Sequence, residues 1–107
     1  MDKMKYKECI DACQACVAAC LYCASMDLKE EHDMSRCAQL DMECAVICNA
    51  SAQLMSLGSE HSVNICKLCA EVCKQCAEEC EKHDNDHCKQ CAEACRKCEA
   101  ECRKIAA

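Results

Sequence analysis

The chain has 107 residues, of which 18 are cysteine, and it carries a formal net charge of −6. Leu, Ile, Val and Phe together supply only 14 residues, a share too low for an ordinary hydrophobic core. The length suits one small domain, so we expect 1–107 to form a single domain with a core of cysteines. The acidic balance and the two aromatic residues argue against a nucleic-acid partner.

Neither a membrane span nor export is expected. The sequence lacks a run of about 18 purely apolar residues, and its first segment, MDKMKYKECI, has no apolar h-region and no twin arginine. We therefore expect a cytoplasmic protein, in a reducing compartment where thiols stay free or bind metal.

Four helices are predicted from the cysteine spacing, because steps of three, four and seven place side chains on one face of an α-helix. The four groups are Cys9, Cys13, Cys16, Cys20 and Cys23; Cys37, Cys44 and Cys48; Cys66, Cys69, Cys73, Cys76 and Cys80; and Cys88, Cys91, Cys95, Cys98 and Cys102. The predicted helices cover 3–26, 34–57, 60–82 and 86–104, and Gly58 is typical of a helix C-cap. Short connections favour an all-α, antiparallel up-down four-helix bundle with a cysteine-lined core.

Residues 66–80 and 88–102 match at nine of fifteen positions, so the repeating unit is one cysteine-striped helix. Thiols pack less well than leucine, so a role in packing the core does not by itself explain 18 cysteines. Disulfide-rich domains usually have irregular cysteine spacing and many turns, whereas this chain has one Gly and no Pro. Metal binding is the leading interpretation, since C-x-x-C and C-x-x-x-C put two sulfurs one helical turn apart.

Cu(I) fits this pattern better than other metals. Zinc needs closed groups of four ligands, and iron–sulfur clusters need loop spacings such as C-x-x-C-x-x-C, which is absent here. Cu(I) is soft and prefers thiolates, and exchanging one H⁺ for one Cu⁺ keeps a buried core neutral. This exchange predicts about one Cu(I) per cysteine, on the order of 18 ions, which indicates storage and not catalysis. We therefore expect no enzymatic activity.

Extending the stripes past the cysteines predicts that the two ends of the bundle differ. One end collects Met26, Met34, His83 and His87, and Asp41 takes the stripe position between the first two cysteines of its helix. Thioether and imidazole bind Cu(I) more weakly than thiolate does, so this end is interpreted as the entrance for copper. The other end is expected to be an apolar plug made of Tyr6, Ala52, Met55, Val63 and Ile105. Extra apolar residues on the first two helices, such as Leu21 and Val46, suggest a subunit interface.

The pattern resembles the bacterial copper storage proteins, specifically their cytosolic branch. The resemblance covers the whole chain and rests on the four striped helices and on segments such as CQACVAACLYC, LDMECAVIC and CKQCAEACRKC. It implies a homotetramer of four-helix bundles filled with Cu(I), and an open end where His83, His87, Asp41, Met26 and Met34 help copper in. Exported members begin with a twin-arginine signal, which this sequence does not show. The second helix departs from the pattern, with three cysteines and Asp41 in the fourth position.

Two other functions stay open at this point. A general thiolate buffer for soft metals such as Zn, Cd or Ag would use the same residues. A thiol redox protein would need an activated thiolate in a partly exposed, electropositive site, which inward stripes on an acidic chain do not favour.

Overall fold

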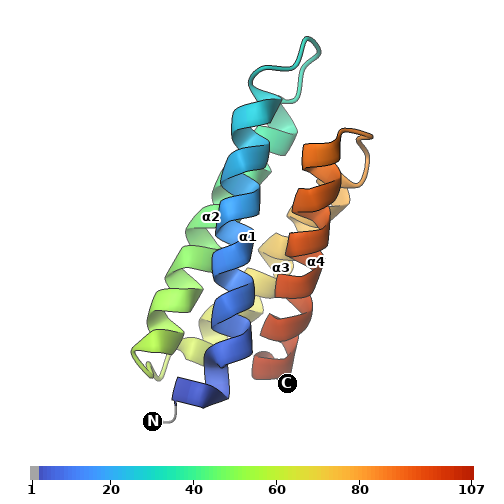
Figure 1. Ribbon diagram of the computed structural model, residues 1–107. Helices are drawn as coiled ribbons and strands as arrows, with labels where there is room; N and C mark the ends of the chain where they lie inside the picture. The colour runs from blue at the N-terminus through green and yellow to red at the C-terminus, as the bar shows by residue number, and fades with distance from the viewer. Residues whose placement is uncertain (1–2) are drawn as a thin grey trace.

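The computed structural model describes residues 3–107, and within that range all regular structure is helical (Figure 1). A 3-10 turn, η1 (Lys3–Tyr6), leads into α1 (Lys7–Asp27), which is followed by α2 (Ser35–Ser56), α3 (Ser62–Cys80) and α4 (Asp86–Ala106). The four predicted helices are confirmed close to their predicted boundaries, except that η1 replaces the first turn of the first helix. Residues 1 and 2 of the predicted domain lie outside the described part.

The helices form an antiparallel up-down bundle measuring 48 × 20 × 18 Å, as predicted (Figure 1). Helix α1 packs against α2 and α4, and α3 packs against the same two helices. The connections 28–34 and 81–85 lie at one end, which we call the loop end. Both ends of the described chain and the connection 57–61 lie at the other, which we call the terminal end.

Gly58 ends α2 as the sequence predicts. It is the one described residue with a positive φ, 66°, a conformation that costs glycine little because it has no Cβ. The Ser59 N–H donates to the Leu54 carbonyl at 3.0 Å, and the Gly58 N–H donates to the Met55 carbonyl at 3.0 Å. This pair of bonds is a Schellman motif, which satisfies the last carbonyls of α2 and turns the chain towards α3.

The core is built almost entirely from small side chains. All 18 cysteines are buried, and alanines beside the stripes are buried with them, including Ala12, Ala24, Ala38, Ala45, Ala70, Ala77 and Ala92. Since alanine adds only a methyl group at the helix contacts, the four backbones approach closely enough for their sulfurs to touch. The bundle is thus held at the spacing that the thiols require.

Helix α1 is the most apolar helix of the described chain by the measure used for membrane spans. By length and composition it is apolar enough to cross a membrane, with a hydropathy of 1.5. Its apolar character comes mainly from Ala and Cys, and its five cysteines all lie inside the bundle. A buried core helix passes the same test, so the hydropathy of α1 follows from its thiol stripe.

The predicted plug at the terminal end is only partly confirmed. Tyr6, Ala52 and Met55 are buried and Ile105 packs against the core, but Val63 is 41% exposed. The inward position is taken instead by Ser62, four residues before the first cysteine of α3, and its hydroxyl donates to the Ser59 carbonyl at 2.8 Å. A step of four keeps the inward direction here, whereas the step of three to Val63 does not.

Candidate metal centre

The cysteine stripes of all four helices face one another along the bundle axis, as the spacing predicts. Every cysteine is a free thiol, and none is more than 2% exposed. Neighbouring sulfurs are separated by 3.5 Å at the closest, between Cys13 and Cys98, and by up to 4.0 Å between Cys23 and Cys88. A disulfide bond is only about 2.05 Å long, so these are non-bonded thiols.

Contacts between helices join the stripes into one column of sulfurs, which we call the thiol column. Near its middle, the Cys44 sulfur of α2 lies 3.8 Å from Cys16, 3.7 Å from Cys73 and 3.9 Å from Cys95. These three neighbours come from α1, α3 and α4, so all four helices meet at one sulfur. One turn along, Cys48 contacts α3 and α4 again.

The thiol column divides into overlapping groups of four sulfurs that all lie within 4.8 Å of one another. Two of these groups are Cys16, Cys20, Cys44 and Cys95, and Cys20, Cys76, Cys91 and Cys95. Four sulfurs bound to one ion at about 2.3 Å lie about 3.8 Å apart, which matches the thiol contacts. Because adjacent groups share members, the arrangement suits metal ions bridged by common thiolates better than separate four-ligand sites.

Burial opposes ionisation of the thiols in the metal-free column. The clearest case is Cys88 at the loop end, where burial, followed by the nearby Cys37 and Asp27, raises the pKa of the thiol to about 12. A thiolate without a cation loses its hydration in this environment, so the proton is retained. Metal binding must therefore displace protons from the thiols.

Asp41 is fully buried inside the thiol column, as its stripe position predicts. Its Oδ1 accepts contacts from the thiols of Cys76 at 3.2 Å, Cys91 at 3.3 Å and Cys80 at 3.5 Å. Burial, together with the nearby Cys91 and Cys76 thiols, raises the pKa of the Asp41 carboxyl to about 11. The raised pKa favours the protonated carboxyl, and the group lies within the column and not at the surface of the loop end.

His87 links the thiol column to the loop end. It lies in the first turn of α4 and is 7% exposed, with Nδ1 3.4 Å from the Cys23 sulfur and 3.5 Å from the Cys88 sulfur. The same nitrogen lies 3.5 Å from Asp27 Oδ1, and Nε2 lies 3.0 Å from Glu30 Oε1. The imidazole ring thus spans from the outermost thiols to a carboxylate in the connection 28–34.

Asp27 and Glu30 are parts of this end that sequence reasoning missed. Asp27 is buried four residues after Cys23, so the helical spacing allows its inward position, whereas the step of three leads to the half-buried Met26. Burial, followed by hydrogen bonding with Cys37, raises the pKa of Asp27 to about 6. Glu30 lies in a connection without periodicity, and the sequence offers no signal for it. It also accepts a hydrogen bond from the Asn85 amide at 2.8 Å, which joins the two connections.

Met34 and His83 are the other residues predicted for the loop end. Met34 is buried as the residue before α2. His83 is partly exposed, and its Nε2 lies 3.1 Å from Glu79 Oε2, so its ring pairs with a carboxylate outside the column. Of the predicted histidines, the structure brings His87 to the thiols.

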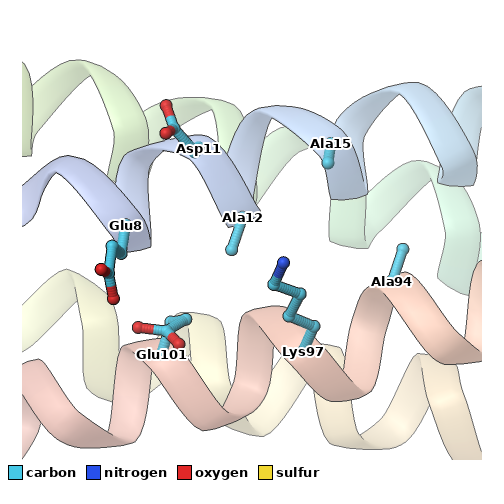
Figure 2. Close-up of a pocket in the computed structure, with 7 residues that line it drawn as sticks. All are labelled: Glu8, Asp11, Ala12, Ala15, Ala94, Lys97 and Glu101. Atoms are coloured by element: carbon cyan, nitrogen blue, oxygen red, sulfur yellow. The ribbon is translucent and has the colours of Figure 1, made fainter.

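A surface groove of about 500 Å³ runs between α1 and α4, away from the thiol column (Figure 2). Figure 2 shows Lys97 reaching from α4 towards α1, with the carboxylates of Glu8 and Glu101 farther along the groove on one side of it. The floor is made of alanines, because their short side chains leave the helix contact open. The described residues that line this groove include no cysteine, so it is separate from the metal centre.

The chain matches known proteins over nearly its full length. The sequence model of the family described as copper storage protein matches residues 2–107. An uncharacterised cysteine-rich protein of Bacillus subtilis, YhjQ, is 45% identical over 86 residues, which are 78% of this chain and 80% of that relative. The structure is similar to the Cu(I)-bound copper storage protein BsCsp3, with 43% identity, a TM-score of 0.92 and coverage of 95% of this chain and 98% of that one. It is also similar to the copper storage protein Ccsp of Streptomyces lividans loaded with 10 copper equivalents, with 37% identity, a TM-score of 0.88 and coverage of 92% and 80%.

Proposed function

Because the chain belongs to the copper storage protein family, we propose that it stores Cu(I) as many thiolate-bound ions inside the bundle. The observation that carries this proposal is the continuous column of 18 buried thiols, whose sulfurs are spaced like ligands of shared metal ions. The similar BsCsp3 is described as Cu(I)-bound, and the Streptomyces protein as loaded with 10 copper equivalents.

The charge of the core favours Cu(I) over zinc. Each thiol that exchanges a proton for Cu⁺ stays neutral, whereas a zinc ion held by four thiolates leaves two negative charges in a buried site. Since no Lys or Arg is buried among the described residues to balance such charge, monovalent ions suit the thiol column best. A general buffer for soft metals is the alternative that a zinc titration tests.

The capacity that we propose is about one Cu(I) per thiol, on the order of 18 ions per chain. A store of this kind needs no turnover, and we propose no catalytic activity. Catalytic thiols usually lie in partly exposed, electropositive sites, whereas these thiols are buried in a chain of net charge −6.

Copper is proposed to enter at the loop end. His87 offers a nitrogen within 3.5 Å of two outer thiols, and Glu30 extends this path towards solvent. A neutral imidazole binds Cu(I) more weakly than a thiolate, so an ion passed from His87 to Cys23 or Cys88 moves to a stronger ligand. Met26, Met34 and His83 surround this end as further exchangeable donors, and Asp41 lies one layer deeper.

We place the protein in the cytoplasm, where reducing conditions keep its thiols free. We also propose association into the homotetramer that the family resemblance implies. Segment 12–26 carries no charged residue, and Leu21, Tyr22 and Val46 are 52%, 53% and 71% exposed on α1 and α2. A neutral, apolar face on one hairpin of an otherwise highly charged chain suits contact with further copies.

The test is an anaerobic titration of reduced, metal-free protein with Cu(I) in the presence of a chromogenic chelator, repeated with Zn(II). We expect a sharp endpoint near one Cu(I) per cysteine and much less zinc. An endpoint of one or a few Cu(I) would instead indicate a carrier or sensor. Zinc saturating at about one ion per four cysteines, with copper binding no better, would favour the general buffer.

A further inference from the structure

The thiol column has an unusual layer at the terminal end, where α2 contributes a thioether in place of a thiol. The stripe of α2 runs from Cys44 and Cys48 to Met55, two turns beyond the last cysteine. Met55 is fully buried, unlike Met42, which lies on the same helix and is 45% exposed. Its inward position brings a fourth sulfur to a layer in which the other three helices supply cysteines.

The Met55 sulfur, and not only its methyl group, meets the column. The Cys66 thiol of α3 donates to Met55 Sδ at 3.7 Å, the same separation as between thiols in the middle of the column. The Cys66 thiol also interacts with Cys9 of α1 and Cys102 of α4, whose sulfurs lie 3.6 Å apart. The layer therefore contains three thiols and one thioether, all buried and drawn from four helices.

Thioether chemistry suits this place. A methionine sulfur is a soft donor for Cu(I), and it is neutral, so it adds a ligand without adding charge. Three thiols that exchange protons for Cu⁺ stay neutral, and a thioether completes the coordination of an ion at the closed end of the column. A leucine of similar size would fill the same space, but the ion at the closed end of the column would have one sulfur ligand fewer.

We propose that Met55 is a Cu(I) ligand at the terminal end of the thiol column, where its sulfur binds the innermost ion together with the thiolate of Cys66. This inference rests on the proposed storage of Cu(I). It changes the interpretation of Met55 from apolar plug to metal ligand, and it makes the closed end a mixed thiolate–thioether site.

The experiment compares Met55→Leu with the matched control Met42→Leu in the full-length protein. Each reduced, metal-free chain is loaded anaerobically with Cu(I) against a chelator concentration that just leaves the unmodified protein full. We expect Met55→Leu to hold about one Cu(I) fewer under this competition. Met42→Leu should match the unmodified protein, since its side chain is exposed on the outer surface.

A second measurement needs no substitution. Methionine labelled with ¹³C at its methyl group is incorporated into the unmodified chain, and the methyl resonances are followed by NMR during Cu(I) loading. We expect the Met55 resonance to move as the last ions bind. A Met55 resonance that keeps its metal-free position in the fully loaded protein would overturn the inference, as would a Met55→Leu chain with the unmodified capacity. If the unmodified chain binds only one or a few Cu(I), the storage proposal itself is wrong and the Met55 site is lost with it.

Discussion

Asp41 offers the sharpest test of how this core tolerates charge. Its carboxyl is fully buried among the thiols of Cys76, Cys80 and Cys91, and its pKa is raised to about 11, chiefly by burial. In the unfolded chain the same group ionises near its ordinary value of 3.8. Between these two values the folded protein binds one proton more than the unfolded chain, so stability falls as pH rises. The substitution Asp41→Asn removes this titrating group, and with it the contribution of Asp41 to the pH dependence of stability.

The size of the effect follows from the difference between pH 7 and the ordinary pKa. Holding the proton on Asp41 at pH 7 costs the folded state about 4 kcal/mol, and at pH 4 the cost falls below about 1 kcal/mol. Asparagine keeps the shape of the side chain, but its amide finds only thiol partners, which costs about 1 kcal/mol. We therefore expect Asp41→Asn to raise the free energy of unfolding by about 3 kcal/mol at pH 7 and not at pH 4.

The assay is urea denaturation of the metal-free protein, anaerobic and reduced, followed by far-UV circular dichroism at both pH values. Asp11→Asn is the control, because Asp11 is exposed and forms an ion pair with Lys7 at 2.8 Å. It should change stability by less than about 1 kcal/mol at either pH. A variant at position 41 that is less stable than the unmodified protein by the same amount at both pH values would refute the reasoning. It would show that the carboxyl is ionised in the column and stabilised by the thiols.

Three further predictions concern loading with Cu(I). Cys44→Ser should lower the Cu(I) capacity by about two ions and Cys9→Ser by about one. The reason is that Cys44 contacts all three other helices, while Cys9 lies in the last layer of the column. Equal losses of capacity in the chelator titration would contradict this prediction. Full loading at pH 7 should release on the order of 18 protons per chain, measured by pH-stat, since burial keeps the thiols protonated; a much smaller release would mean that thiolates exist before copper binds. His87→Gln should slow Cu(I) uptake about tenfold in stopped-flow experiments and leave the endpoint unchanged; an unchanged rate would place the entrance elsewhere.

The local pattern of the sequence was enough to predict the helices and their inner faces. Steps of three and four between cysteines repeat with the period of an α-helix, so each stripe and its inward direction follow from the chain alone. The buried place of Asp41 follows from the same periodicity, and Gly58 marks a helix end because glycine is the residue typical of a helix C-cap. The number of thiols and the charge that a buried core can hold favour Cu(I) over zinc.

At the ends of the stripes, only the tertiary structure decides which residue faces inward. Three and four are both helical steps, so the sequence allowed Met26 or Asp27 after Cys23, and Val63 or Ser62 before Cys66. The packing of neighbouring helices selects the step of four in both cases, and it buries Asp27 and Ser62.

Contacts between distant parts of the chain also lie beyond the sequence. The contact of His87 with Glu30 joins the first turn of α4 to the connection 28–34, across 57 residues, and the contact of Met55 with Cys66 depends on how α2 turns into α3. A stripe records the direction of a side chain on its own helix, but not its height relative to the next helix. That height is set when the helices pack, and it determines which sulfurs, nitrogens and carboxyls can share a copper ion.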